Sequence, residues 1–124
     1  MWYDPRTRQE AIDKYGEIGD WDVISVTDMS KLFQGMRDFN ENISQWETDN
    51  VTTMYQMFLG CRSYNQPVEG LNTTNVTSME FMFLNCSSFD QPVEGLNTAN
   101  VTTMMGMFLC CSSLGQLPSW YSDF

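Results

Sequence analysis

The 124-residue sequence contains no histidine. This absence excludes serine–histidine and cysteine–histidine nucleophilic pairs, and it excludes histidine-ligated zinc. Paired carboxylates remain possible in principle, because the chain holds 16 Asp and Glu residues. An active site, however, needs different groups that converge in one pocket. No such constellation is evident, so we expect no enzyme, no catalytic residues, no metal site and no cofactor.

Basic residues are also scarce. The chain has six Lys and Arg residues, none of them after Arg62, and its net charge is −10. Nucleic-acid binding depends on neutralising phosphates with Lys and Arg, and anionic membrane surfaces attract the same residues. We therefore expect no nucleic-acid partner, no membrane insertion and no small-molecule ligand, which leaves another protein or an assembly as the partner.

Long apolar runs are missing as well. The N-terminus lacks the apolar core of a signal peptide, and the longest apolar run, around Met104–Cys111, is too short to span a bilayer. The expected location is intracellular or virion-associated if the chain is complete. If the chain is a fragment of a larger protein, the expected location is the cell surface.

What the sequence does contain is an internal repeat. The word Val-Thr-x-Met recurs at one constant interval, at 26–29, 51–54, 76–79 and 101–104. Residues 66–90 match residues 91–115 at 18 of 25 positions without a gap. A period of this size is typical of a stack of repeats that share one core. We assign four repeats, at 18–42, 43–67, 68–92 and 93–117.

The third repeat shows the pattern within each unit. Its apolar residues are Val76, Met79, Met82, Phe83 and Cys86. Those spacings are typical of a helical stripe, and they predict a helix over 78–85. Alternation over 89–93 predicts a short extended segment, and the Gly- and Asn-rich stretch 94–100 predicts a turn. The expected fold class is therefore α/β, with short parallel strands on one side and short helices on the other.

The motif words resemble a known family. They are Met57-Phe58, Cys61, Tyr64-Asn65-Gln66-Pro67 and Asn75-Val76-Thr77. As a set they resemble the BspA-like leucine-rich repeats, in the 25-residue variant abundant in mycoplasma surface proteins and also found in protists and large viruses. The resemblance covers about 18–117. It implies a right-handed leucine-rich-repeat-like solenoid of four coils and a role in adhesion or protein binding.

The segments outside the repeats read as caps. Residues 5–17 predict a helix ended by Gly16, within an N-terminal cap over 1–17. Residues 118–124 are expected to fold over the fourth repeat as a C-terminal cap. The two caps and the repeats form one domain.

Three cysteines recur once per repeat, at Cys61, Cys86 and Cys111. Because each ends an apolar stripe, we expect buried, reduced thiols that behave as small apolar side chains. A disulfide or a bound metal is the alternative. Cys110 and Met105 lie off the stripe and are expected to be exposed, whereas the other Met residues of the repeats are expected in the core.

Polar residues also form rows. Asn50, Asn75 and Asn100 are expected to bond turn backbone between repeats, with glycosylation of their Asn-Val-Thr sequons as the alternative. Glu69 and Glu94 occupy equivalent places and are expected to stack as like charges. Solvated turn carboxylates are the expectation there, and a weak calcium site is the alternative.

These rows suggest a protein–protein interaction module, because stacked repeats present extended rows of side chains as binding surfaces. The candidate partner-binding residues are Asn40, Asn65, Asp90, Gln66, Gln91, Glu69 and Glu94. This face is polar and acidic, so its partner should be neutral or basic. Trp and Tyr residues at the two ends are the rival contact site. Alternative functions are a small cementing subunit of a virion or other large assembly, and a fragment of a surface adhesin.

Overall fold

The computed structural model describes residues 5–123 and begins with a helix. Helix α1 spans Pro5–Tyr15, and the 3-10 turn η1 follows at Ile18–Asp20. Gly16 ends α1 with a positive φ of 79°, and its N–H donates to the Ile12 carbonyl at 2.8 Å. The glycine-ended N-terminal helix is thereby confirmed, because glycine adopts this conformation without a steric penalty. Residues 1–4 of the predicted cap lie outside the described residues.

The predicted α/β solenoid of four coils is wrong. Outside α1 and η1, residues 5–123 contain no further helix, and their strand-like pairing is limited to isolated bridges. Parallel bridges join Asp28 to Thr53, Thr53 to Ser78, and Ser78 to Thr103. The helix expected over 78–85 is a succession of turns, and the segment 89–93 forms no strand. The repeats are therefore irregular in secondary structure.

Hydrogen bonding explains why no helix forms over 78–85. The N–H groups of Met79, Phe81, Phe83 and Asn85 donate to carbonyls of the following repeat, at 2.9 Å each. Those donors cannot also bond the carbonyl four positions back, as an α-helix requires. The intervening N–H groups close turns, as Met82 does onto the Met79 carbonyl at 3.2 Å. Successive turns of this kind also bury residues three or four apart, so they imitate a helical stripe.

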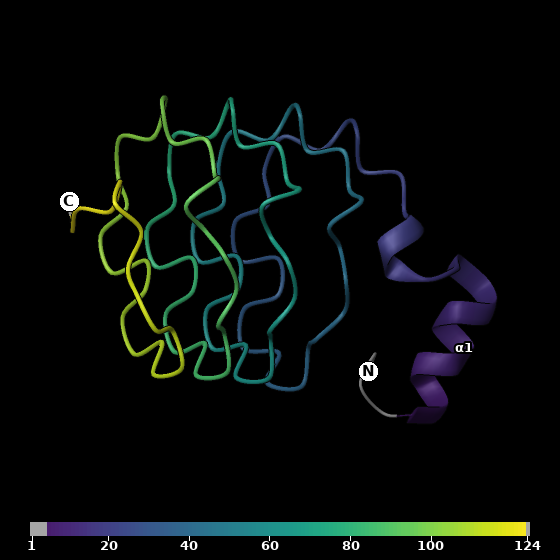
Figure 1. Cartoon of the computed structure of the whole chain (residues 1–124). Coiled ribbons are helices and arrows are strands. Elements are labelled where there is room, and N and C mark those ends of the chain that lie inside the picture. The colour runs from purple at the N-terminus through teal and green to yellow at the C-terminus, as the bar shows by residue number, and fades with distance from the viewer. Residues whose placement is uncertain (1–4, 124) are drawn as a thin grey trace.

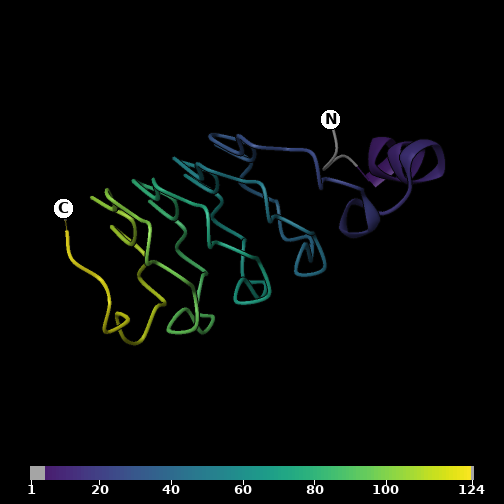
Figure 2. The same ribbon diagram turned by 90° about the horizontal axis from the view of Figure 1, so that it is seen from above.

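The same bonding joins each repeat to the next. N–H groups at every second position donate to carbonyls of the following repeat, four at each junction; the donors are Met29, Lys31, Phe33, Gly35, Met54, Gln56, Phe58, Gly60, Met79, Phe81, Phe83 and Asn85. Figures 1 and 2 show the resulting row of repeats, with α1 at one end and the C-terminus at the other. Cross-linking between neighbours, and not local secondary structure, holds the backbone in place.

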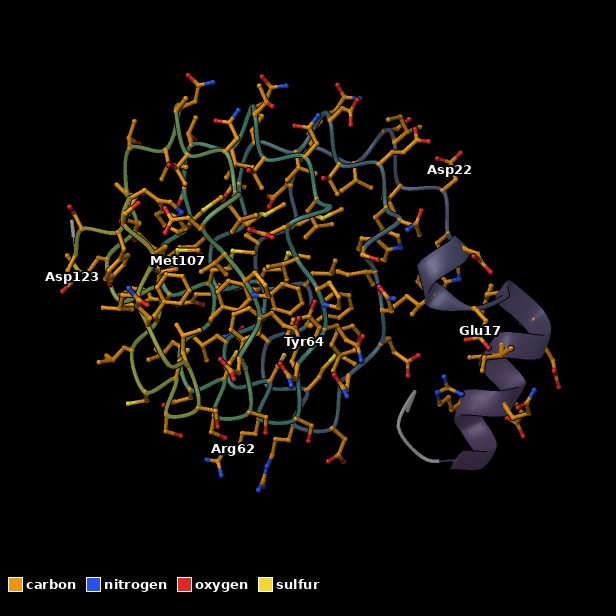
Figure 3. All side chains as sticks on the ribbon, viewed as in Figure 1. Glu17, Asp22, Arg62, Tyr64, Met107 and Asp123 are labelled. Carbon is orange, nitrogen blue, oxygen red and sulfur yellow. The ribbon has the colours of Figure 1, made fainter. Side chains whose placement is uncertain are left out.

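Two columns of aromatic rings fill the core. Phe33, Phe58, Phe83 and Phe108 stack from repeat to repeat, with centroids 5.7, 5.4 and 5.8 Å apart. Phe39, Tyr64 and Phe89 form the second column, at 5.6 and 6.0 Å. Figure 3 shows the rings side by side in the interior, near the labelled Tyr64. Offset stacking of this kind adds to the free energy of burying each ring. The seven described methionines at the stripe positions in repeats two to four and at Met29 are also buried, as the sequence predicts.

Candidate functional surface

The structure brings most of the predicted partner-binding residues together in one row, which we call the polar ladder: Asn40, Asn65, Gln66, Asp90 and Gln91. The Asn40 side-chain oxygen accepts the Asn65 N–H at 2.8 Å, and the Asn65 oxygen accepts the Asp90 N–H at 3.0 Å. Gln66 and Gln91 donate their side-chain amides to the same two asparagines, at 3.0 to 3.2 Å. These side chains therefore hold neighbouring repeats in register as well as facing solvent.

Asp90 ends the polar ladder and differs from the residues before it. Within residues 5–123, no donor reaches its carboxylate, although the equivalent Asn40 and Asn65 oxygens are both occupied. Its side chain is exposed and borders an open groove of about 550 Å³. The groove is lined by 90–94 and 114–118. An acceptor without a donor thus lies beside a concave surface.

Glu69 and Glu94 do not oppose each other as like charges, which corrects that expectation. A Glu69 carboxylate oxygen accepts the Gly95 N–H at 2.6 Å, and Glu94 accepts the Ser119 N–H at 2.9 Å and the Ser119 hydroxyl. The hydroxyl and N–H of Ser119 hold the pKa of Glu94 below its usual value, because they stabilise the charged form. Both glutamates therefore connect neighbouring turns.

The asparagine and threonine rows are structural, as expected. Asn50, Asn75 and Asn100 donate their side-chain amides to carbonyls of the preceding repeat, at 2.6 to 2.7 Å. Thr48 and Thr73 are buried and donate their hydroxyls to carbonyls of the following repeat. These bonds satisfy turn backbone groups that local structure leaves open.

One family model matches residues 6–120, under the description "Mycoplasma protein of unknown function, DUF285". The chain belongs to this family. No curated protein and no solved structure shows significant similarity to it. The family match covers nearly all of α1, all four repeats and the start of the predicted C-terminal cap, so the polar ladder lies wholly inside the family region.

The DUF285 repeats keep their cysteine thiols in the core. Cys61, Cys86 and Cys111 are free and buried, and each Sγ–H donates to a Phe carbonyl of the preceding repeat, at 3.0 to 3.1 Å. Burial raises the pKa of Cys61 to about 12 and that of Cys111 to about 11. Cys110 is exposed, as expected. The favoured prediction of buried reduced thiols therefore agrees with the structure.

Two searches of the described residues concern metals and membranes. Across residues 5–123, no three His, Cys, Asp or Glu side chains gather closely enough to hold a metal ion. The same part of the chain contains no helix with the length and apolarity needed to cross a bilayer.

Exposed apolar side chains at the two ends of the row are a feature that sequence reasoning only partly anticipated. Among the side chains described, the large exposed apolar ones are Tyr15, Trp21, Val26, Leu32, Met105, Leu109 and Leu117. All of them lie in or before the first repeat, or in the fourth. The end aromatics were named as a rival contact site, but the aliphatic residues were not. Comparison of Leu32 with Met57, Met82 and Met107 could have found them, because an end residue lacks the neighbour that covers its equivalents.

Proposed function

We propose that this chain is a non-enzymatic protein-binding module that contacts its partner through the polar ladder and the groove beside Asp90. The observation that carries this proposal is the Asp90 carboxylate, which stands in register with two occupied acceptors and has no donor of its own within residues 5–123. A partner that supplies an N–H donor there would continue the ladder.

Charge defines the partner further. Asp90 and Glu94 line the groove without a basic residue among its lining residues, and nothing after Arg62 is basic. A basic side chain, or a backbone N–H flanked by one, complements this surface, and charge complementarity also speeds association. Because Glu94 already binds Ser119, Asp90 is the carboxylate that is left for a partner.

The test compares Asp90→Lys with Asp49→Lys, which places the same charge change on an exposed turn elsewhere in the repeat. Partners are captured from extracts of the source organism by crosslinking and counted by mass spectrometry. We expect wild type and Asp49→Lys to retain partners that Asp90→Lys loses. Asp90→Asn keeps the acceptor of Asn40 and Asn65 and should retain part of the capture. An identical set of partners with all three proteins would overturn the proposal.

A structural subunit of a larger assembly is the second candidate. The observation that favours it is the exposed apolar side chains at both ends of the row, since such patches mark contact sites. A density gradient of source extracts should then find the protein with large particles. Recovery only in the low-mass fractions would count against this function.

The closer relation to BspA-like repeats is also a proposal, supported by Met57-Phe58, Cys61 and the Tyr64–Pro67 word. It favours adhesion at a cell surface as the setting of the binding module. Protease treatment of intact cells tests this setting, because a surface protein should be digested while an internal one survives.

A further inference from the structure

The two ends of the row expose side chains whose equivalents inside the row are buried. Leu32 is 45% exposed, whereas Met57, Met82 and Met107 at the same repeat position are at most 1% exposed. Val26 is 36% exposed, whereas Val51 and Val76 are fully buried. The difference has one cause, which is that the first repeat has no repeat before it.

The backbone at the C-terminal end also lacks a neighbour. In repeats one to three, the four ladder N–H groups donate to the following repeat. In the fourth repeat the corresponding donors are Met104, Gly106, Phe108 and Cys110. Only Gly106 is occupied, by the Asp123 carboxylate at 2.7 Å. Within residues 5–123 the N–H groups of the other three find no acceptor.

The first repeat presents the complementary edge. The carbonyls of Asp28, Ser30, Leu32 and Gln34 occupy the acceptor positions that Thr53, Tyr55, Met57 and Leu59 fill in the second repeat. They accept no N–H from the described part of the chain. Helix α1 contacts this repeat through the Arg8–Glu41 ion pair at 2.9 Å and leaves Leu32 and Val26 exposed.

We infer that the C-terminal end of one chain docks onto the first repeat of a second copy, head to tail. The constant repeat length places Met104, Phe108 and Cys110 in register with Asp28, Leu32 and Gln34 of the next copy, so the junction repeats the contact already made three times within the chain. Exposed Leu109 and Met105 then lie at the same junction as Leu32 and Val26. Unpaired ladder groups are a known template for such pairing.

The pairing has one polarity. Two C-terminal ends would bring N–H donors against donors, and two first repeats would bring carbonyls against carbonyls. Only head-to-tail contact joins donors to acceptors, and contacts of that kind propagate into open-ended chains. The inference is independent of the polar ladder, because it uses the ends of the row and not its side.

Sedimentation velocity tests the inference on the purified chain at loading concentrations from about 10 µM to about 1 mM, the range of weak specific contacts. We expect a series of oligomers that grows with concentration. It should also grow with salt, because each copy carries a net charge of −10 and salt screens the repulsion. A monomer at every concentration, in low and high salt, would overturn it.

Two end variants make the test specific. Leu32→Glu blocks the first repeat and Leu109→Glu blocks the fourth, and each alone should weaken association at least about tenfold. An equimolar mixture of the two variants still holds one intact end of each kind, so it should form dimers and stop there. Thr74→Glu adds the same charge on an exposed turn in the middle of the row and should assemble like wild type. If the mixture stays monomeric while Thr74→Glu assembles, or if all variants assemble equally, the head-to-tail contact is wrong.

Discussion

Tyr64 occupies the place that phenylalanine fills on both sides of it in the second aromatic column. Its ring stacks on Phe39 at 5.6 Å and on Phe89 at 6.0 Å, and the residue is fully buried. Its hydroxyl is buried without a hydrogen-bond partner among the described residues. An unsatisfied buried hydroxyl loses its water and gains nothing in return, which destabilises a fold by about 1 to 3 kcal/mol.

Tyr64→Phe should therefore stabilise the fold by about 1 kcal/mol, because it removes the hydroxyl and keeps the ring. Urea denaturation measures the change. Phe89→Tyr is the matched control, since it adds a hydroxyl to the same column and should destabilise. A loss of stability in Tyr64→Phe would mean that the hydroxyl has a partner, such as a buried water.

The four cysteines differ in environment and should differ in reactivity. Cys61, Cys86 and Cys111 have raised pKa values because burial disfavours the thiolate, which is the reactive form. At pH 8 a thiol reagent should modify Cys110 rapidly and the other three only as the fold opens. In denaturant all four should react at one rate. Rapid modification of two or more thiols in the native protein, or none, would contradict this assignment.

The turns that replace the predicted helices depend on left-handed backbone at fixed repeat positions. Gly35, Gly60, Asn85 and Cys110 are equivalent and all have φ between 63° and 77°. A side chain there raises the energy of the turn, and glycine avoids this penalty. The penalty should be measurable where a new Cβ meets no other atom.

Gly35→Ala provides that case, because its φ is 75° and nothing lies within 4 Å of the added carbon. We expect a loss of about 1 kcal/mol in the free energy of unfolding, from backbone strain alone. Gly115→Ala also meets no atom but has no positive φ. This control should be neutral or stabilising, since alanine restricts the unfolded chain. Thermal unfolding compares the two, and equal effects would remove backbone strain as the explanation.

These turns also show what the sequence could and could not predict. The repeat, the buried Phe, Met and Cys positions, and the glycine-ended helix α1 followed from periodicity and residue type. Helices within the repeats did not, because Val76, Met79, Met82 and Phe83 fit consecutive turns as well as a helical stripe. Gly35 and Gly60 were an available signal, since glycine mid-pattern lowers confidence in a helix. Which ladder residue would lack a donor, as Asp90 does, depends on the end of the row and not on its own repeat.

At the scale of the whole molecule, the titratable groups of the core all shift in one direction. Cys61, Cys86, Cys111 and Tyr64 stack through neighbouring repeats, and burial raises the pKa of each. Burial likewise raises the pKa of Tyr121, at the end of the row, to about 12. The fold thus favours the protonated form of every one of these groups.

Stability should consequently fall at alkaline pH. The unfolded thiols lose their protons near the ordinary value of 9, whereas folded Cys111 and Cys61 keep theirs until about 11 and about 12. The stabilisation from these groups is complete below pH 9 and is lost as pH rises through the folded values, at roughly 1.4 kcal/mol per pH unit for each thiol. Urea midpoints measured between pH 7 and pH 11 should therefore be level at first and then decline. Rising negative charge acts in the same direction, so Cys61→Ala separates the two causes: it should decline less steeply than wild type, while Cys110→Ser should follow wild type. A Cys61→Ala curve parallel to wild type would assign the alkaline loss to surface charge and not to the core.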